Sequence, residues 1–313
     1  MNSKEITLDT LKLQTIEHMN ECTICPRNCK VNRNLGQKGY CREDNQVRIA
    51  RAALHMWEEP CISGEEGSGT VFFSGCAMGC VFCQNRNIAT DEVGKAVAIE
   101  RLAEIFIELQ EKKANNINLV TPSHYVYQIR EAIKLARDRG LKLPIVYNSS
   151  AYELVETIQV LDGFIDIYLP DMKYYEEAIA MRYSKAKNYF ETAKDAIAEM
   201  VRQVGLPEFD VNGHMTKGVI VRHLALPGYV KDSKKIIMYL YETYGDSIYI
   251  SIMNQYTPLP HVSEYREINR KLTKKEYEDL IDYAISLGVE NGFIQEGETA
   301  SESFIPAFDY EGV

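Results

Sequence analysis

The sequence FFSGCAMGCVFCQN, residues 72–85, joins a short apolar run to three closely spaced cysteines. They are Cys76, Cys80 and Cys83. The C-x3-C-x2-C spacing lets three thiolates turn toward one centre, and Gly75 and Gly79 permit the tight backbone that this requires. A closed zinc or [4Fe-4S] site normally takes four protein ligands. The motif therefore predicts a metal site that either borrows a fourth ligand or keeps one position open for a substrate.

A second group of cysteines lies nearer the N-terminus, in a polar loop too short to be held together by burial alone. It has the spacing C-x2-C-x3-C-x11-C and consists of Cys22, Cys25, Cys29 and Cys41. A bound metal would supply the missing folding energy. The loop also contains unopposed basic residues, which would offset the negative charge of four metal-bound thiolates. The turns at Pro26 and Gly39 favour zinc, whereas a second iron-sulfur cluster could relay electrons, and both alternatives stay open.

The composition indicates what kind of protein contains these cysteines. The chain has 313 residues, of which 45% are hydrophobic and 26% are charged, as in ordinary globular proteins. It contains neither a signal-peptide layout nor an apolar run approaching the roughly 18 residues of a membrane helix. We therefore expect a soluble, cytoplasmic protein whose thiols stay reduced and bind metal, with Cys61 as a small buried hydrophobe. The net charge of −10 disfavours nucleic acids and anionic membranes as partners.

From residue 70 onward, short β-branched runs alternate with longer stretches of helical periodicity. Strands are predicted at 70–74, 117–121, 143–148, 164–169, 218–224, 247–252 and 292–295. Helices are predicted at 98–113, 126–140, 151–161, 189–205, 233–245 and 273–288. This order implies parallel strands with right-handed crossovers, in either a doubly wound sheet or a barrel-like sheet. We expect an N-terminal extension over residues 1–60, with the metal loop at 22–41, and a core over residues 61–313.

Polar or small residues follow each predicted strand, and this favours the barrel. Those that could bind a ligand are Thr121, Ser123 and His124, then Asn148 and Ser150, then Asp171 and Lys173, then Arg222 and His223, and finally Asn254. In parallel α/β barrels, the carboxyl ends of the strands form the rim of the active site. The three-cysteine motif stands at the end of the first of these strands. The sequence therefore predicts one rim that holds both the metal and its ligand.

The three-cysteine motif directly after a first strand resembles the radical SAM superfamily. The segments FFSGCAMGCVFCQN, NLVTPSHY, LPDMKY and VRHLALPG are similar to the branch related to pyruvate formate-lyase activating enzyme, and the resemblance covers roughly residues 20–300. It implies a partial (βα)6 barrel in which Cys76, Cys80 and Cys83 ligate a [4Fe-4S] cluster. S-adenosylmethionine (SAM) would chelate the fourth iron. One electron, from a donor such as flavodoxin or ferredoxin, would then release a 5′-deoxyadenosyl radical that abstracts hydrogen from a substrate.

The resemblance also assigns SAM contacts to individual residues. Phe82 matches an aromatic position beside the adenine, and Asp171 and Lys173 match an Asp-x-Lys motif whose lysine reaches the SAM carboxylate. The second strand should end in a Gly-Gly-Glu-like segment that binds the SAM ammonium. This chain instead has Thr121, Pro122, Ser123 and His124 there. Hydroxyl and carbonyl oxygens would have to accept the ammonium hydrogens in place of a carboxylate.

The remaining contacts follow from the chemistry of the side chains. Asn148 and the hydroxyl of Ser150 could hold the ribose. Arg222 and His223 lie in an apolar strand, where burial is costly without polar partners, so we expect at least one of them to contact the ligand. Asn254 is a candidate from its place at a strand end.

The sequence does not identify the substrate. The activating-enzyme resemblance favours a protein or peptide, such as a glycyl radical enzyme, and a small molecule or RNA is the alternative. A third hypothesis is an iron-sulfur electron carrier or interaction protein that never cleaves SAM. The open three-cysteine site argues against it, because a pure carrier would be expected to close its cluster with a fourth cysteine.

Overall fold

The apolar runs of the sequence form one ten-stranded sheet in the computed structural model, which describes residues 7–90, 93–295 and 306–313. Within these ranges, seven neighbouring strands run parallel, and each overlaps a predicted strand. In spatial order they are β2 (Ser68–Phe73), β4 (Ile117–Val120), β5 (Ile145–Ser149), β6 (Ile167–Pro170), β8 (Met215–Leu224), β9 (Tyr249–Met253) and β10 (Gly292–Ile294). The parallel order brings the carboxyl ends of all seven to one edge of the sheet.

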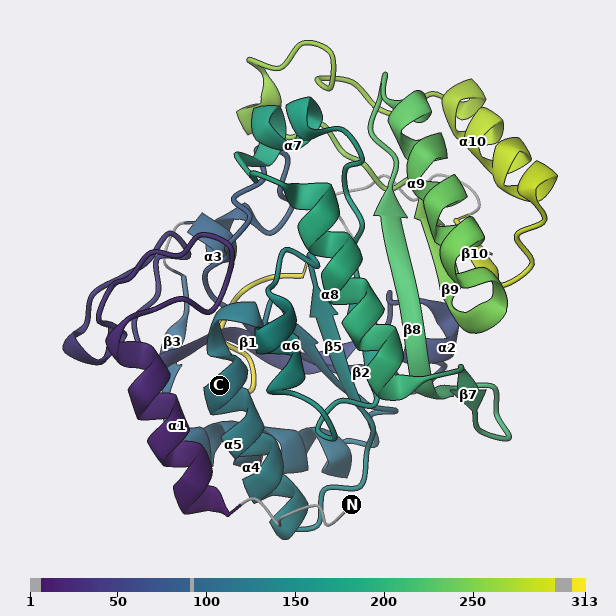
Figure 1. Ribbon diagram of the computed structural model, residues 1–313. Coiled ribbons are helices and arrows are strands. Elements are labelled where there is room, and N and C mark those ends of the chain that lie inside the picture. Colours follow the sequence, from purple (N-terminus) through teal and green to yellow (C-terminus); the bar gives the residue numbers. More distant parts are fainter. Residues whose placement is uncertain (1–6, 91–92, 296–305) are drawn as a thin grey trace.

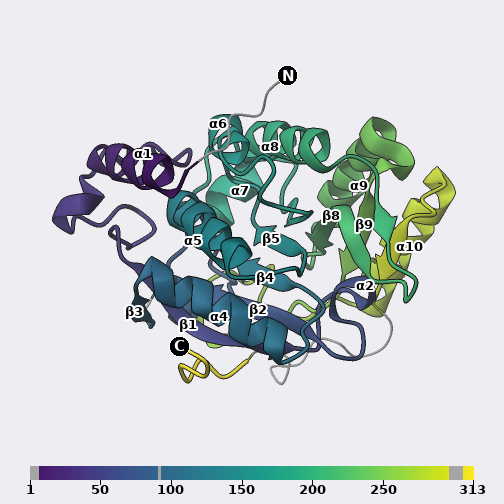
Figure 2. The ribbon, with the colours of Figure 1, turned by 90° about the horizontal axis from the view of Figure 1, so that it is seen from below.

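The helices between the strands cover the outer face of this sheet. They are α4 (Ile99–Glu111), α5 (Val126–Asp138), α6 (Val155–Gln159), α7 (Glu177–Ser184), α8 (Tyr189–Val204), α9 (Val230–Tyr244) and α10 (Lys274–Leu287). These helices pack on the sheet because each has an apolar face. In α4, that face consists of Leu102, Ile105, Phe106 and Leu109, which are all buried. Figure 2 shows the strands curving in an arc with these helices outside it. The prediction of a partial parallel barrel is confirmed.

Two helical details differ from the prediction. The stretch 151–161 forms only the short helix α6, because residues 151–154 first leave the rim of the sheet in an irregular path. Helix α7 follows the end of β6 and was not predicted, since its eight residues are too short for a clear period. Helix α10 begins with a capping box between Thr273 and Glu276 and ends at Gly288, as its sequence suggests.

Alternation along each strand separates the inside of the arc from the outside. In β6, Tyr168 joins the large core beneath the helices, whereas Ile167 and Leu169 point to the inner face. There they meet Cys61 and Ile62 of the short helix α2 (Pro60–Ser63). Since α2 also packs near the first residues of several strands, it closes the amino-terminal end of the arc. The carboxyl-terminal end is thereby left as the entrance to the interior.

The N-terminal region adds an antiparallel edge to the sheet. Strand β1 (Val47–His55) pairs with β2, and β3 (Lys95–Val97) pairs with β1. Neither was predicted, because β1 mixes arginines and alanines in place of a continuous apolar run. Helix α1 (Leu8–Asn20) packs on α5, where the ring of His18 stacks on that of Tyr127 at 4.5 Å. The division at residue 60 stays a prediction.

The remaining elements are short and lie in the connections between these strands and helices. They are η1 (Arg33–Leu35), α3 (Arg86–Thr90), η2 (Ser123–Tyr125), β7 (Glu208–Phe209), η3 (Gly245–Ser247) and η4 (Pro260–Val262). The segment 306–313 runs along β1 (Figure 1). The ring of Phe308 packs edge-on against that of Phe72, with 5.3 Å between the ring centroids. Among the described helices, none has the length and apolar character needed to span a bilayer.

The helix layer should dominate stability. Phe106 of α4 is completely buried, so Phe106→Ala should lower the free energy of unfolding by about 3–5 kcal/mol through lost contacts and the cavity left behind. Ile285 of α10 is 62% exposed, and Ile285→Ala should change it by less than about 0.5 kcal/mol. Urea denaturation followed by circular dichroism measures both effects. Equal losses in the two variants would contradict the assigned packing.

Candidate active site

Three cysteines at the carboxyl end of β2 line one cavity of about 420 Å³ together with the ends of the neighbouring strands. We call residues 74–85, which contain them, the three-cysteine loop. Gly75 and Gly79 both have positive φ angles, of 82° and 63°. A Cβ on Gly75 would lie 2.5 Å from the carbonyl oxygen of Cys41, and one on Gly79 would lie 2.9 Å from the Tyr40 hydroxyl. Only glycine fits at these positions because another segment presses against the loop.

The sulfur atoms of the three-cysteine loop face hydrogen-bond donors. The backbone N–H of Met78 donates to Cys76 Sγ at 3.3 Å, and the hydroxyl of Ser184 donates to Cys80 Sγ at 3.0 Å. Burial raises the pKa of Cys83 to about 12, and it raises that of Cys76 as well. Thiols of this kind ionise when a metal centre compensates the negative charge. The donor set, three thiols with donors aimed at sulfur, therefore fits an iron-sulfur cluster.

A chain of charged groups crosses the cavity wall next to these sulfurs. The Asp171 carboxylate accepts hydrogen bonds from Lys173 Nζ at 2.6 Å and from Arg222 Nε at 2.9 Å. Burial alone would raise the pKa of Asp171, but Arg222 and Lys173 lower it below its ordinary value. Burial would lower the pKa of Lys173, yet Asp171 and the nearby Cys80 raise it. All three side chains are therefore charged at neutral pH.

The structure brings most of the predicted ligand-binding residues together. Those that line the cavity with the three cysteines are Phe82, Thr121, Asn148, Ser150, Asp171, Lys173 and Arg222. Thr121 has a φ of 59°, which is strained for a β-branched residue. Such strain costs roughly 1–3 kcal/mol and clusters at functional sites. The rim predicted from the strand ends thus exists and surrounds the three-cysteine loop.

Four predicted residues do not line this cavity. Alternation along β8 turns Arg222 inward and His223 outward, where the ring nitrogen Nδ1 of His223 lies 2.8 Å from the Met172 carbonyl oxygen. The backbone N–H of Asn254 donates to the Gln295 side chain at 3.0 Å, which ties the ends of β9 and β10 together. Ser123 and His124 start the buried helical turn η2 that follows the end of β4.

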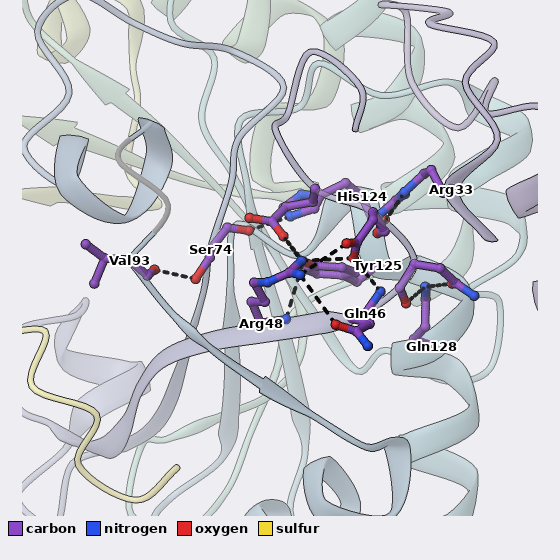
Figure 3. A network of polar contacts seen from close by, with 11 residues as sticks. Arg33, Gln46, Arg48, Ser74, Val93, His124, Tyr125 and Gln128 are labelled. Atoms are coloured by element: carbon purple, nitrogen blue, oxygen red, sulfur yellow. Dashed lines mark hydrogen bonds and ion pairs between the residues drawn. The ribbon is translucent and has the colours of Figure 1, made fainter. Parts of the chain in front are cut away.

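His124 belongs to a polar network that supports the three-cysteine loop from behind (Figure 3). Its Nε2 lies 2.6 Å from the carbonyl oxygen of Ser74, and burial lowers its pKa to about 3, so the ring is neutral. Arg33 donates to the His124 carbonyl oxygen at 2.6 Å. The hydroxyl of Tyr125 donates to the Glu43 carboxylate at 2.8 Å, and that carboxylate also pairs with Arg48. The network joins the β4 end to residues 33–48.

The second cysteine group, in the four-cysteine loop (residues 22–41), also folds together. Burial raises the pKa of Cys25 to about 12, and the neighbouring Cys41, Cys22 and Cys29 add to the effect. Burial likewise raises the pKa of Cys41 to about 11. The backbone N–H of Tyr40 donates to Cys29 Sγ at 3.2 Å. Within the described part of the chain, no three His, Cys, Asp or Glu side chains converge as the ligands of a single metal ion do.

Arg27 connects the two cysteine loops. Its guanidinium donates to the carbonyl oxygens of Ala77 at 2.7 Å and Met78 at 3.1 Å in the three-cysteine loop. It also donates to the carbonyl oxygens of Ser184 and Lys185, at the end of α7. The guanidinium lies over the ring of Tyr40, with its central carbon 3.8 Å from the ring centroid. One side chain thus holds the four-cysteine loop, the three-cysteine loop and α7 in a fixed arrangement.

Sequence reasoning missed two acidic residues of the cavity, Glu58 and Glu59, which line it from the segment between β1 and α2. Glu58 pairs with Arg222 at 3.2 Å. The sequence feature that could have pointed to them is the occurrence of two glutamates, next to Trp57 and Pro60, in an otherwise apolar segment. The pair precedes the first predicted strand, so no strand-end argument could have found it.

The role of Arg27 can be tested by replacement. Arg27→Lys should lower the free energy of unfolding by roughly 2 kcal/mol, because lysine cannot reproduce the fork of charge-assisted hydrogen bonds. It should also loosen the three-cysteine loop, seen as faster loss of iron from reconstituted protein exposed to a chelator. Lys30→Ala removes an exposed charge from the same loop, paired with Glu21 at 3.7 Å, and should leave both measurements unchanged. Identical iron retention in Arg27→Lys and wild type would contradict the bridging role.

Comparison with known proteins places this geometry in context. The chain is 30% identical over 275 residues to an uncharacterized protein of Methanocaldococcus jannaschii, MJ0674, a match that covers 84% of this chain and 74% of that protein. The crystal structure of Streptococcus suis SuiB bound to S-adenosylmethionine is similar in fold, with 14% identity and a TM-score of 0.50. That match covers 73% of this chain and 52% of SuiB, so the chain spans about half the length of SuiB.

A domain of pyruvate-formate lyase-activating enzyme from Bacteroides vulgatus is a more distant match. It has 11% identity and a TM-score of 0.40, and the match covers 55% of this chain and 92% of the domain. The sequence model of the radical SAM superfamily, by contrast, matches residues 70–240, which is more than half of the chain and includes the three-cysteine loop. With that match added to a partial barrel whose cavity is lined by all three cysteines of the loop, the chain belongs to the radical SAM superfamily.

Proposed function

We propose that this radical SAM enzyme holds its [4Fe-4S] cluster with Cys76, Cys80 and Cys83 and abstracts hydrogen from a protein or peptide substrate. When bound, the cluster and SAM supply the one-electron cleavage that yields a 5′-deoxyadenosyl radical. The observation that carries the proposal is a single cavity lined by the three thiols and by a fixed Asp171, Lys173 and Arg222 chain. Burial in this cavity would keep water away from a reactive intermediate.

The chain's own residues would bind and orient SAM. Lys173 donates one hydrogen bond to Asp171, and the charge of Cys80 contributes to its raised pKa. Its other N–H groups could therefore donate to the SAM carboxylate. Phe82 offers an apolar ring beside the adenine. Asn148 and Ser150 would hold the ribose hydroxyls, and Thr121 would accept from the SAM ammonium. These roles are supported by the common lining of the cavity.

The activating-enzyme-like role and the peptide substrate rest on the motif resemblance. A small molecule or RNA is the alternative substrate, and it would use the same SAM chemistry. For the electron donor we propose flavodoxin or ferredoxin, which are acidic carriers. Their approach is supported by the exposed basic residues of the four-cysteine loop and its neighbour, which are Lys30, Lys38 and Arg42.

We propose that the four-cysteine loop binds a metal, either one zinc ion or a second [4Fe-4S] cluster. The raised pKa values of Cys25 and Cys41 support a metal in general, because buried thiols that repel one another gain most from a bound cation. The hydrogen bonds of Arg27 keep this loop against the three-cysteine loop. A cluster there could pass electrons to the first cluster, whereas zinc would stabilise the loop alone.

The central experiment is SAM cleavage. Anaerobically reconstituted protein, reduced with dithionite and given SAM, should yield 5′-deoxyadenosine and methionine, which are measured by chromatography and mass spectrometry. Cys80→Ala should abolish both products. Cys61→Ala is the matched control, because Cys61 is about as buried but lies in α2 and packs against apolar residues of β5, β6 and β8. It should retain cleavage. Full cleavage by Cys80→Ala would refute the ligand assignment.

Metal analysis addresses the four-cysteine loop separately. A protein with Ala at Cys76, Cys80 and Cys83 should still retain metal, because only the first site has been removed. About one zinc per chain would identify the zinc alternative, and about four irons would identify the cluster. Adding Cys25→Ala to this protein should release the metal. Absence of bound metal in the triple variant would contradict the proposal.

A further inference from the structure

The most unusual chemistry outside the assigned SAM contacts is the acidic pair Glu58 and Glu59. Both lie in the segment that enters α2, which packs against the first residues of the strands at the amino-terminal end of the arc. Both nevertheless line the same cavity as the three cysteines. The pair therefore enters the barrel interior from the amino-terminal end, and Glu58 meets the rim residues Arg222 and Asn148 there.

Glu59 has spare hydrogen-bonding capacity in a buried position. Its side chain lines the cavity, the residue is 8% exposed, and among the described residues its Oε2 has no hydrogen-bond partner. Glu58 differs, because it pairs with Arg222 Nη1 at 3.2 Å and lies 3.4 Å from Asn148 Nδ2. A buried carboxyl oxygen without a partner costs free energy. A ligand with a suitable donor would remove that cost.

The charged groups around the pair indicate the sign of the charge that a ligand should carry. Arg222 is the cation nearest to both glutamates, and its guanidinium already donates to Asp171, Asn148 and Glu58. Burial raises the pKa of Glu58 and Glu59, and Arg222 opposes this. The other titratable groups around them are Asp171 and Lys173 after β6, Cys61 in α2 and His55 at the end of β1. Glu59 Oε2 thus has no donor while Arg222 is already engaged, and a cationic N–H group would supply one.

We propose that Glu58 and Glu59 bind a cationic nitrogen group of the substrate, an ammonium or a guanidinium such as that of a lysine or arginine side chain. The inference rests on the proposed peptide substrate and specifies what part of it enters the barrel. The cationic end would form charge-assisted hydrogen bonds with Glu59 inside the cavity. The carbon that loses hydrogen would then lie between this end and the three-cysteine loop.

SAM also carries an ammonium group, and this chain lacks the Gly-Gly-Glu-like segment expected to bind it. The position of the pair favours the substrate instead. The amino acid part of SAM is expected at the three-cysteine loop beside Lys173, whereas the side chains of Asp171 and Arg222 stand between Lys173 and Glu58. Thr121 lies on the rim itself, next to the end of β4.

Binding measurements test the proposal without turnover. The probes are Nα-acetyl-lysine N-methylamide and its neutral counterpart Nα-acetyl-norleucine N-methylamide, titrated calorimetrically into reconstituted protein saturated with SAM and left unreduced. The lysine probe should bind at least about tenfold more tightly, as expected for one charge-assisted hydrogen bond. Equal affinities for the two probes would overturn the proposal.

Variants assign the effect to the glutamates. Glu59→Gln should weaken the lysine probe about tenfold or more, while the exposed Glu65→Gln, six residues further on, should not change it. Glu59→Asp keeps the charge and should retain the preference for lysine over norleucine. This variant provides the test if the glutamine variant fails to fold. An unchanged lysine affinity in folded Glu59→Gln would overturn the assignment.

A separate experiment tests whether the glutamates bind the ammonium group of SAM or that of the substrate. Equilibrium dialysis with radiolabelled SAM should give the same affinity for wild type and Glu59→Gln. Weakened SAM binding with unchanged lysine binding would assign the pair to SAM and overturn the substrate proposal. Failure of the wild type to cleave SAM would instead refute the proposed function, and it would leave these binding results as they stand.

Discussion

The site depends on the contact between two cysteine loops that are far apart in sequence. Arg27 provides it, because one planar guanidinium satisfies carbonyl oxygens of the three-cysteine loop and of the end of α7 at once. Loop carbonyls that face away from regular structure need such partners when they are buried. The contact also explains why Gly75 and Gly79 admit no side chain. Any metal in the four-cysteine loop would stabilise the same junction.

The barrel interior is organised by charge as much as by shape. Arg222 stands between Asp171 and Glu58, and Asp171 in turn accepts a hydrogen bond from Lys173, whose pKa Asp171 and Cys80 raise. Removing one member would leave a buried charge without its partner, which costs more than an exposed pair is worth. The chain thereby places a lysine on one side of Asp171 and the Glu58 carboxylate beyond Arg222 on the other.

The strand and helix pattern of the core was predictable because each element carries its own local signal. All seven parallel strands have short apolar runs, and their shared direction implied the common rim. The antiparallel strand β1 was not predictable, because its alanines and arginines become a strand only through pairing with β2. Likewise, Arg222 and His223 are neighbours in sequence, and their assignment to opposite faces depended on which side of β8 the arc encloses.

The sequence by itself determined the three-cysteine loop, its place after the first parallel strand and most of the polar rim, since these follow from spacing and periodicity within short segments. Only the tertiary structure decided that Arg27 reaches a carbonyl 158 residues away, that His124 supports the loop from behind, and that Glu58 and Glu59 enter the cavity. Such contacts join segments whose separation in sequence carries no periodic signal. They arise from the curvature of the sheet and from the closure of its amino-terminal end by α2, which local residue patterns do not encode.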